Sequence, residues 1–345
     1  MKKRALILAG GSGKRFWPLS EKGTPKQLIS VFSEKSLIEE TIERLKGFFE
    51  KGEIFIVTNK ELGKKLSSIL KDFPEEQILS EPQPKNTAPS ILWAVSLFEK
   101  DDEDILFGIF PSDHFIADEK KFSERLSLAF ELANSKEKLI TFGIIPTSPD
   151  TGYGYIETEK EPLVLENEKR YFKVLSFKEK PDFKTALKYL KSGNFFWNSG
   201  MFIWKGHVFR DNLKKYSTYF SEFYEKMRSG EDIEKIFSEI KSESIDYALL
   251  EKSKEILLVE GDFRWSDVGS FKSLYELLEK GENGNVLKGN GLFVNSNNSF
   301  IHSKESSVAV IGLDNVFVIV NKNKILVGDI NKSQLVKEAY EFFEK

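Results

Sequence analysis

The segment Leu8–Phe16 combines three glycines with two basic residues, in the order LAGGSGKRF. Glycines let the main chain approach phosphate oxygens closely and point its N–H groups toward them. Lys14 and Arg15 add positive charge where a polyphosphate would lie. The spacing matches neither a P-loop nor a dinucleotide-binding fingerprint. The segment therefore favours phosphate binding, and the alternative is a plain strand-to-helix turn followed by exposed basic residues.

Two aspartates stand at positions that suit a divalent metal. Asp113 follows the apolar run 105–110 in the sequence FPSDH, and Asp267 lies in the sequence WSDVGS, which is typical of a turn. Ligands of open α/β sheets bind beyond the carboxyl ends of strands, and Mg²⁺ prefers hard oxygen ligands. Each aspartate taken alone could instead cap a helix or a turn. His114 is expected to be structural, because phosphoryl transfer needs little from a base.

Three further polar residues suit a phosphorylated sugar. Glu179 and Lys180 end a predicted strand in the sequence FKEKP, and Asn198 lies between aromatic residues in WNSGMF. A carboxylate and an amide can bind sugar hydroxyls, and a lysine can bind a phosphate. A solvated strand end and core aromatics are the alternative interpretation. Lys26, in the sequence PKQ, is on its own most easily explained as a surface lysine.

The elements that must position these residues follow from the apolar pattern. We expect strands at 5–9, 53–58, 105–110 and 139–144, and helices at 36–49, 61–70, 87–98 and 122–133. Strands that alternate with helices indicate a parallel sheet, and near-continuous apolar strands indicate that both of its faces are buried. The expected fold class is therefore α/β, with a Rossmann-like, mostly parallel sheet and helices on both faces.

The pattern changes along the rest of the chain. Further strands are expected at 155–158, 171–180, 200–205 and 255–260, and helices at 209–216 and 220–227. Beyond residue 281 short strands follow one another at 291–294, 299–302, 308–311, 316–320 and 325–328, before a last helix at 332–343. We place a domain boundary near 281–284, which gives a large domain over 1–281 and a small one over 282–345.

Composition excludes several classes of protein. The 345 residues are 40% hydrophobic and 30% charged, with a net charge of −3, so no global attraction to nucleic acid or anionic membranes is expected. The chain has no cysteine, which excludes disulfides, thiolate metal sites and cysteine nucleophiles. The N-terminal apolar run is too short for a signal peptide, and no apolar stretch approaches the ~20 residues of a membrane span. We expect a cytoplasmic protein.

In their order along the chain, these motifs resemble the sugar-nucleotide pyrophosphorylases. The matching segments over residues 8–270 are LAGGSGKRFWPLS, PKQ, EPQPKNTAP, PSDH, GYGYI, FKEKPD, WNSGMF and WSDVGS. The segment EPQPKNTAP favours the branch that transfers guanylyl groups to mannose 1-phosphate. The tail sequence VAVIGLDNVFVIV is similar to the small C-terminal domain of the family, a left-handed β-helix. Since the chain ends soon afterwards, we expect it to lack the fused isomerase module of bifunctional relatives.

The resemblance implies a reaction between GTP and mannose 1-phosphate, and it assigns a role to each phosphate-binding residue. The residues implied to bind the nucleotide phosphates through the loop are Leu8, Gly10, Gly11, Ser12 and Gly13. Lys14 and Arg15 would hold the β- and γ-phosphates, and Lys26 the α-phosphate. Lys180 would hold the sugar phosphate. Asp113 and Asp267 would bind Mg²⁺, the implied cofactor.

The resemblance also implies binding sites for the base and the sugar. The residues implied to line the base and ribose site are Glu81, Asn86, Thr87 and Ala88. Those implied to contact mannose are Gly152, Tyr153, Glu179 and Asn198. In the family no covalent enzyme intermediate forms, so a chain without cysteine lacks nothing that the reaction needs.

Two alternatives stay open at this stage. The substrate could be another sugar 1-phosphate or another nucleotide, or the protein could be a non-catalytic regulatory subunit that binds GDP-mannose. Such a subunit could have lost the aspartates or the Lys14–Arg15 pair, which this chain retains. A homodimer is expected, with the β-rich tail as its interface. We also expect a chain cut at about Gly284 to keep its nucleotide site residues intact but to have reduced assembly or stability.

Overall fold

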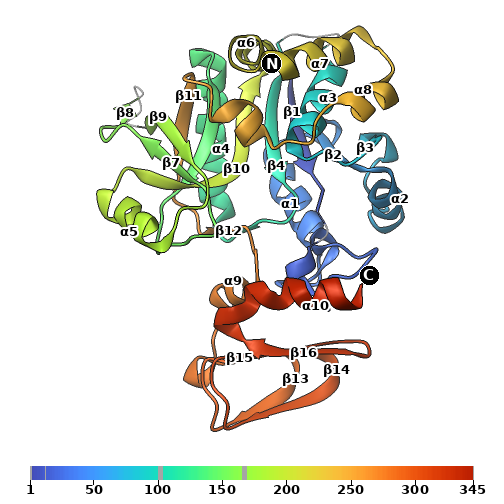
Figure 1. Ribbon diagram of the computed structural model, residues 1–345, viewed down its shortest axis with the longest axis vertical. Coiled ribbons are helices and arrows are strands. Elements are labelled where there is room, and N and C mark those ends of the chain that lie inside the picture. The colour runs from blue at the N-terminus through green and yellow to red at the C-terminus, as the bar shows by residue number, and fades with distance from the viewer. Residues whose placement is uncertain (1, 12, 100–103, 165–168, 345) are drawn as a thin grey trace. The chain divides into compact units, whose positions relative to one another are not determined.

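The computed structural model describes residues 2–344, apart from residue 12 and the segments 100–103 and 165–168 (Figure 1). The chain divides into two compact units, each made of several segments. The sheet unit comprises Met1–Gly10, Ile42–Ser112 and Ile116–Trp265. The tail unit comprises Gly11–Thr41, Asp113–Phe115 and Ser266–Lys345. Most of the glycine-rich loop therefore belongs to the same unit as the end of the chain.

The sheet unit is built on a ten-stranded sheet in its described part, with the order β3-β2-β1-β4-β10-β6-β11-β9-β7 and with β8 beside β9. Its strands are β1 (Lys3–Leu8), β2 (Ile54–Asn59), β3 (Ile78–Glu81), β4 (Leu106–Pro111), β6 (Leu139–Ile144), β7 (Tyr155–Thr158), β8 (Leu163–Val164), β9 (Arg170–Lys178), β10 (Phe195–Lys205) and β11 (Ile256–Gly261). Strands β3, β2, β1 and β4 run parallel to one another, as expected.

The other half of the sheet corrects the expectation of a mostly parallel arrangement. Strand β10 runs antiparallel to both β4 and β6, and β9 runs antiparallel to β11 and β7. Among the described strands of this half, β6 and β11 are the one parallel pair. The sheet is thus mixed. An apolar run in a sequence reports that a strand is buried, but it carries no information about the direction of its neighbours.

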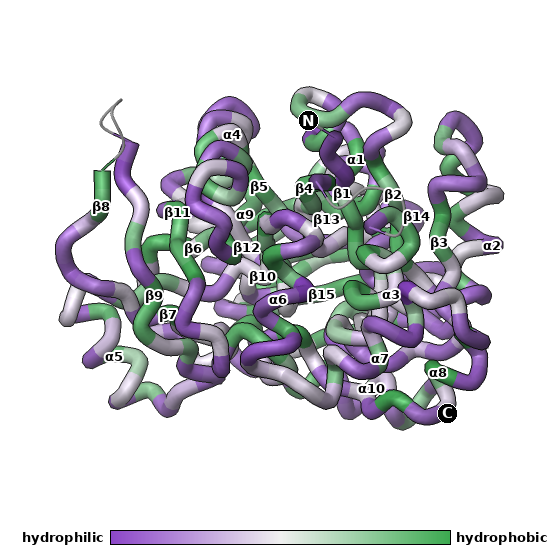
Figure 2. Tube along the Cα trace, turned by 90° about the horizontal axis from the view of Figure 1, so that it is seen from above, coloured by the Kyte–Doolittle hydropathy of each residue, from purple (hydrophilic) through white to green (hydrophobic). Residues whose placement is uncertain are grey.

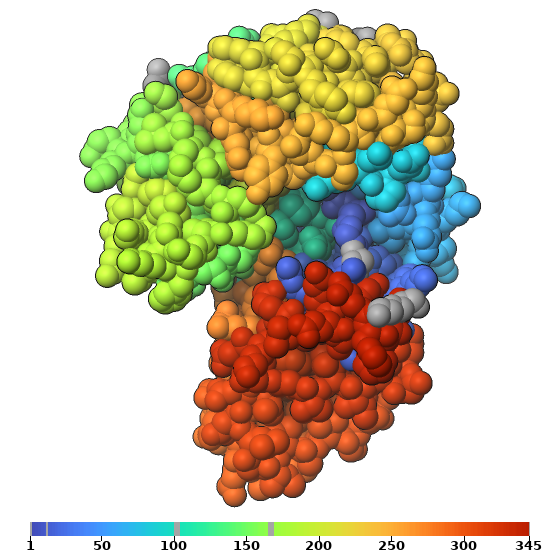
Figure 3. All heavy atoms as spheres, viewed as in Figure 1, coloured from blue at the N-terminus to red at the C-terminus, as the bar shows by residue number. Residues whose placement is uncertain are grey.

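Helices cover both faces of this sheet, as predicted. In Figure 2, α4 (Glu119–Lys136) lies on one side of the strands and α6 (Gly206–Tyr216) on the other, and strand segments such as β6 and β11 are coloured mainly as hydrophobic. The remaining helices of the unit are α2 (Lys60–Ile69), α3 (Thr87–Glu99), α5 (Phe183–Ser192), α7 (Thr218–Ser229) and α8 (Ile233–Glu239). A π-helical turn follows at Asp246–Leu250. In Figure 3 the yellow segment with α6, α7 and α8 forms one continuous patch.

The tail unit contains a second, smaller sheet. Strands β13 (Val286–Val294), β14 (Phe300–Ile311) and β15 (Val316–Asn321) are parallel, and β16 (Lys324–Asp329) returns antiparallel to β15. The strands predicted at 299–302 and 308–311 are a single strand, β14. A 3₁₀ turn (Ile330–Leu335) then leads into α10 (Val336–Phe343), and α9 (Phe271–Leu277) precedes the sheet. The successive parallel strands agree with the predicted tail, and the left-handed β-helix stays a prediction.

The glycine-loop segment shares its hydrophobic core with the small sheet. Phe16 and Trp17 belong to one buried cluster with Phe300, Phe317 and Val336. This shared core leads us to expect that removal of the residues beyond 284 disturbs the nucleotide site as well as the stability of the fold. Trp17 stacks on Phe343 from that segment, whereas Phe16 packs on Phe271, which precedes it.

Three short elements run across the borders of the two units: α1 (Leu37–Lys46), β5 (Phe115–Ile116) and β12 (Trp265–Ser266). The domain boundary predicted near 281–284 remains a prediction. Among the residues that the structure describes, no helix is long and apolar enough to cross a membrane. The cytoplasmic location also remains a prediction.

Candidate active site

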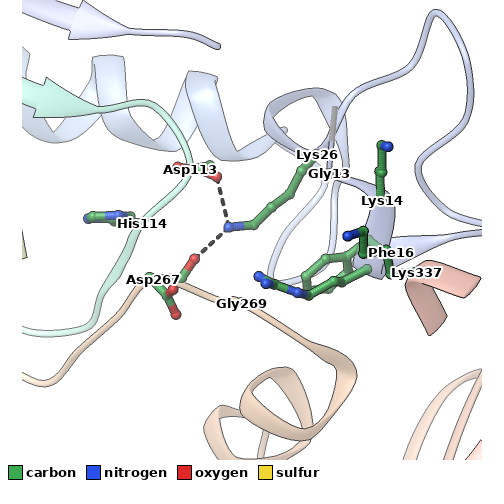
Figure 4. Close-up of a pocket in the computed structure, with 10 residues that line it drawn as sticks. Gly13, Lys14, Phe16, Lys26, Asp113, His114, Asp267, Gly269 and Lys337 are labelled. Atoms are coloured by element: carbon green, nitrogen blue, oxygen red, sulfur yellow. Dashed lines mark hydrogen bonds and ion pairs between the residues drawn. The ribbon is translucent and has the colours of Figure 1, made fainter. Parts of the chain in front are cut away.

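A cavity of about 380 Å³ in the tail unit brings together the predicted phosphate and metal residues. Its predicted members are Gly13, Lys14, Arg15, Lys26, Asp113 and Asp267. Phe16, His114, Gly269 and Lys337 complete the lining. We call this cavity the phosphate pocket (Figure 4). It is assembled from stretches that lie far apart in the sequence, so no local pattern could have revealed it.

Lys26 is the central cation of the phosphate pocket. Its ammonium donates to Asp113 Oδ2 at 2.8 Å and to the main-chain oxygen of Asp267 at 2.5 Å (Figure 4). The side chain of Lys26 is only 10% exposed. Its Nζ also lies 5.8 Å from the centre of the Phe16 ring. The interpretation of Lys26 as a surface lysine is therefore wrong, because a buried lysine of this kind persists only where carboxylate and carbonyl oxygens compensate its charge.

Gly13 is required by the close approach of Lys26. A Cβ at this position would lie 2.5 Å from Lys26 Cβ and 2.8 Å from Lys26 N, so any side chain would displace the lysine. Gly13 also has φ +63°, in the left-handed region that other residues adopt at a cost. The Ser20 hydroxyl donates to its carbonyl oxygen at 2.5 Å and fixes the turn. The glycine thus serves packing in addition to any contact with phosphate.

The pKa of Asp113 lies below its usual range. Burial by itself would raise this pKa, but the charges of Lys26 and His114 and the hydrogen bond from Lys26 outweigh burial. A carboxylate held in the charged form is what a metal or an ammonium group needs as a partner. Asp113 is therefore ionised throughout the neutral range.

Asp267 lies at the start of a strained turn. Val268, the next residue, is fully buried and has φ +48°, an unusual conformation for a β-branched side chain. A Cβ on Gly269 would lie 3.0 Å from the Asp267 carboxylate, so the glycine leaves room for that group. Backbone strain of this kind persists where the surroundings fix it and is frequent at functional sites.

The donor set of the phosphate pocket fits Mg²⁺. In nucleotide sites this ion is held by one or two carboxylates together with substrate phosphates and water. Asp113 and Asp267 supply such carboxylates, and the Lys26 ammonium shows that the position beside them favours a cation. The described residues contain no group of three or more His, Cys, Asp or Glu side chains that could hold a metal alone. A metal here would therefore depend on substrate oxygens.

Two of the predicted sugar residues, Glu179 and Asn198, lie beside Gly154 and Asp246 in the sheet unit. We call these four residues the sugar cluster. Asn198 donates from its main chain to Gly154 O at 2.8 Å and from its side chain to Asp246 Oδ1 at 2.7 Å. Its side-chain oxygen accepts from Gly200 N at 3.0 Å. A Cβ on Gly154 would lie 2.8 Å from Glu179 Oε2, so Gly154 admits the carboxylate.

Sequence reasoning missed Asp246. It lies in the π-helical turn Asp246–Leu250, a type of element that is frequent at functional sites and has no recognisable sequence pattern. Burial raises the pKa of Asp246, the Asn198 hydrogen bond lowers it, and the charge of Glu179 raises it further. Two carboxylates thus lie near one amide, which suits the recognition of several hydroxyls.

The other predicted sugar and phosphate residues of this unit lie around the cluster. Gly152 N donates to Asp150 Oδ1 at 2.6 Å. The Tyr153 ring packs between Trp197 and Trp265, with centroids 4.9 and 5.4 Å away. Lys180 is exposed, forms an ion pair with Glu179 and has φ +35°. Its head group is therefore close to the cluster but open to solvent.

Most of the residues predicted to bind the base already form hydrogen bonds within the protein. Glu81, at the end of β3, is buried, and the Ser90 hydroxyl donates to its Oε2 at 2.5 Å. Burial raises the pKa of Glu81 to about 7, although the Ser90 hydrogen bond opposes the shift. Thr87 Oγ1 accepts from Ile245 N at 2.9 Å, and Ala88 N donates to Glu243 O at 3.1 Å. The Ala88 amide therefore already has an acceptor within the protein.

The remaining loop residues have fewer contacts. Asn86 is exposed with φ +69°. Leu8 O accepts from Ser112 N at 3.2 Å at the end of β1. Gly10 and Gly11 are exposed, and a Cβ at either would meet nothing within 4 Å. Ser12, the other predicted loop residue, lies outside the described residues.

Comparison with known proteins identifies the family of this chain. The family model for nucleotidyl transferases matches residues 4–284. A mannose-1-phosphate guanylyltransferase from Klebsiella pneumoniae is 36% identical over 350 residues, which cover 99% of this chain and 74% of the relative. The alginate biosynthesis protein AlgA of Pseudomonas putida is 37% identical over 346 residues, covering 96% of this chain and 70% of its own.

A solved structure extends the similarity to the whole fold. A mannose-1-phosphate geranyltransferase from Thermus thermophilus superposes with a TM-score of 0.92 at 26% identity, with 100% of both chains covered. The sequence match and the structural match both include the tail as well as the sheet unit. The chain therefore belongs to the nucleotidyl transferase family and, within it, to the mannose-1-phosphate guanylyltransferases.

Proposed function

We propose that this enzyme transfers the guanylyl group of GTP to mannose 1-phosphate, which yields GDP-mannose and pyrophosphate. The observation that carries the proposal is the convergence of Lys14, Arg15 and Lys26 with two aspartates in one pocket. It occurs in a chain 36% identical, over almost its full length, to a mannose-1-phosphate guanylyltransferase. A concentration of fixed positive charge beside carboxylates is what a reaction between two phosphate-bearing substrates requires.

The reaction is a single displacement at phosphorus. A phosphate oxygen of mannose 1-phosphate attacks the α-phosphorus of GTP and forms the new P–O bond. The bond from the α-phosphorus to the bridging oxygen of the β-phosphate breaks, and pyrophosphate leaves with that oxygen. The protein's contribution is to orient the two substrates and to offset their mutual repulsion.

Lys26 is suited to the α-phosphate by its remaining hydrogen-bonding capacity. A lysine ammonium carries three donors. Two of them are directed to Asp113 and Asp267, which fixes the group and leaves one donor for a phosphate oxygen. We assign the β- and γ-phosphates to Lys14 and Arg15, and main-chain contacts with the phosphates to the loop formed by Leu8, Gly10, Gly11, Ser12 and Gly13.

Asp113 and Asp267 would hold Mg²⁺. When bound, this ion neutralises the charge that develops on the phosphate oxygens. Asp113 has a second task in the protein itself, because it holds the Lys26 ammonium in place. Its lowered pKa keeps both functions available at neutral pH.

In the sheet unit we assign the mannose hydroxyls to Glu179 and Asn198, with Gly152 and Tyr153 beside them and Lys180 on the sugar phosphate. We add Asp246 as the residue that orients the Asn198 amide, which supports a fixed direction for its remaining donor. The residues assigned to guanine and ribose are Glu81, Asn86, Thr87 and Ala88.

The organisation of the tail is also a proposal. We propose a large domain over 1–281 and a small left-handed β-helix domain over 282–345. The parallel pairing of β13, β14 and β15 supports coils of this kind. Exposed apolar side chains at Ile311, Ile325 and Val327 support pairing of this sheet with a second copy in a homodimer.

A pyrophosphate-release assay with a panel of nucleotides and sugar 1-phosphates tests the function. We expect GTP with mannose 1-phosphate to give the highest kcat/KM, and excess chelator to abolish turnover. Absence of pyrophosphate release with every pair would contradict catalysis. A clear preference for another sugar would leave the reaction class in place and change the substrate.

A further inference from the structure

The last helix of the chain is fixed against the segment that follows the glycine loop. The rings of Trp17 and Phe343 stack at 5.1 Å with an angle of 5° between their planes. Trp17 Nε1 donates to Glu344 Oε1 at 3.1 Å, and Lys22 N donates to Glu344 Oε2 at 3.4 Å. All these residues belong to the tail unit. The side chains of α10 are thereby held at a defined place beside residues 14–22.

This anchoring brings one cation of α10 to the phosphate pocket. Lys337 lines the cavity together with Lys14, Arg15 and Lys26 (Figure 4). Its side chain is 54% exposed, so its ammonium keeps contact with solvent and needs no buried partner. The reaction as described above gives Lys337 no role. Lys337 is thus a fourth cation at this cavity, beyond those that the α-phosphate and the metal-binding carboxylates require.

A single carboxylate lies close to two of these cations. Glu341 Oε1 is 3.4 Å from Lys14 Nζ and 3.6 Å from Lys337 Nζ. Glu341 follows Lys337 by one helical turn, and its side chain is 47% exposed. Ion pairs of this length between exposed side chains contribute little to stability, so they exchange partners easily.

We propose that Lys337 is a further binding residue for the pyrophosphate part of the nucleotide, and that Glu341 is an internal counter-charge which this anion replaces. The inference rests on the proposed function. A diphosphate group carries more charge than one carboxylate and accepts hydrogen bonds at more oxygens, so Lys14 and Lys337 would turn to it from Glu341. The anion gains the two lysines only by displacing the carboxylate.

The arrangement has a consequence for turnover. The pyrophosphate product would be held tightly by Lys14, Arg15 and Lys337 if the Glu341 carboxylate did not compete, and product release limits the rate of many enzymes. Glu341 reforms its contacts with Lys14 and Lys337 as the product leaves. It therefore lowers the affinity for free pyrophosphate without any change to the residues that hold the α-phosphate.

Titration calorimetry of the full chain with inorganic pyrophosphate and MgCl₂ tests the inference. Lys337→Ala should weaken binding about tenfold, as expected for loss of a hydrogen bond to a charged group, and Lys337→Arg should restore most of it. Glu341→Gln should have the opposite effect on the affinity and tighten pyrophosphate binding several-fold, because it removes the competing charge.

Two matched controls separate these effects from a general change in charge. Lys332→Ala removes an exposed lysine that does not line the cavity, and Glu338→Gln neutralises an exposed glutamate on the same helix. Both should bind pyrophosphate as the wild type does. In the reverse reaction the KM for pyrophosphate should rise in Lys337→Ala, with the KM for GDP-mannose unchanged.

The outcomes distinguish this inference from the proposed function. Wild-type affinity in Lys337→Ala, or weaker binding in Glu341→Gln, overturns the inference while the guanylyl transfer stands. A wild-type protein that binds neither GTP nor pyrophosphate overturns the proposed function and the inference with it. Opposite shifts in the two variants, with unchanged controls, support the exchange of Glu341 for the anion.

Discussion

The phosphate pocket and the sugar cluster differ in the interactions that they offer to a ligand, charge in the pocket and directional hydrogen bonds in the cluster. In the pocket, Lys26 is held by two oxygen acceptors, and further cations surround it. In the cluster, the Asn198 amide is bound at both ends by Gly200 N and Asp246. Charge acts over several ångströms and tolerates imprecise placement, whereas a hydroxyl is recognised by the direction of its hydrogen bonds.

The scaffolds differ in the same way. The pocket is formed by turns, with Gly13 and Val268 at positive φ, and it depends on the aromatic core around Phe16. In the cluster, Asn198 lies on β10, Glu179 follows the end of β9, and Asp246 lies in a π-helical turn. Both strands are fixed by pairing with neighbouring strands. We therefore expect changes near the pocket to affect folding and rate together. Changes in the cluster should affect the sugar substrate alone.

Deletion of residues 284–345 should have the largest effect. It removes Phe300 and Phe317, which share a buried core with the glycine-loop segment, and Phe343, which stacks on Trp17. We therefore expect no measurable activity and no pyrophosphate binding. Within the full chain, Phe317→Ala should destabilise the fold by about 3–5 kcal/mol, and Phe342→Ala, at an exposed site, by far less. Thermal unfolding and calorimetry measure both. A folded, GTP-binding truncation would show that the pocket does not depend on the tail.

Asp113→Asn should have the next largest effect. It keeps the shape of the side chain but removes the charge that holds Lys26, and kcat should fall by about 10²–10³, as for loss of one electrostatic contact in other active sites. Asp262→Asn is a matched control, because this carboxylate pairs with Arg125 at 2.9 Å outside the pocket. Equal kcat in the two variants would show that Asp113 takes no part in the reaction.

Asp246→Ala probes the cluster and should affect only the sugar substrate. It leaves the Asn198 amide without its acceptor, so kcat/KM for mannose 1-phosphate should fall about ten- to a hundredfold. Asp246→Asn keeps an acceptor oxygen and should lose less. The Kd for GTP, measured by calorimetry, should stay unchanged in both. A parallel loss of GTP affinity would mean that the cluster and the pocket are not independent.

Glu179→Ala and Lys180→Ala test separately how the enzyme recognises the ring and the phosphate of the sugar substrate. Loss of Glu179 should impair discrimination among sugars, and loss of Lys180 should raise the KM for every sugar 1-phosphate. Each effect should be about tenfold, because Lys180 is exposed and already paired with Glu179. Steady-state kinetics with mannose and glucose 1-phosphates separates the two. Normal kinetics in both variants would exclude the FKEKP segment from the site.

Local pattern predicted the elements better than their pairing. The strands at 139–144 and 155–158 have the bounds predicted for them, and the helix predicted at 87–98 is α3. The helix α5 was missed although its signals are present, with Asp182 as N-cap and Gly193 as C-cap. The direction of β10 could not be predicted, since it depends on which distant strands flank it.

The same limit applies to the candidate site. The order of motifs predicted that Lys26, Asp113 and Asp267 act together, and the structure places them in one cavity. The burial of Lys26 was not predictable, because its partners follow it at distant positions in the chain. Lys337 lies on an exposed helical face, where a lysine in a sequence carries no sign of a ligand. Sequence patterns thus do not reveal contacts between segments that are distant along the chain.

The smallest predicted effect concerns Glu81 and the choice of base. Guanine offers N1–H and an amine as donors, so a carboxylate at Glu81 can accept from it only when ionised, and adenine lacks the N1 proton. Because burial raises the pKa of Glu81 to about 7, the Kd for GTP should fall as the pH rises through 7, and that for ATP should not.

The effect of pH on the stability of the fold runs in the opposite direction from its effect on GTP affinity. Glu81 stabilises the fold fully below its ordinary pKa of 4.5 and loses this contribution as the pH rises through about 7. In Glu81→Gln both trends should disappear, and the ratio of kcat/KM for GTP over ATP should fall about tenfold. Kinetics and thermal unfolding at pH 6 and pH 8 decide between the interpretations. A ratio that matches the wild type at both pH values would make Glu81 a buried structural acid held by Ser90, with no contact to the base.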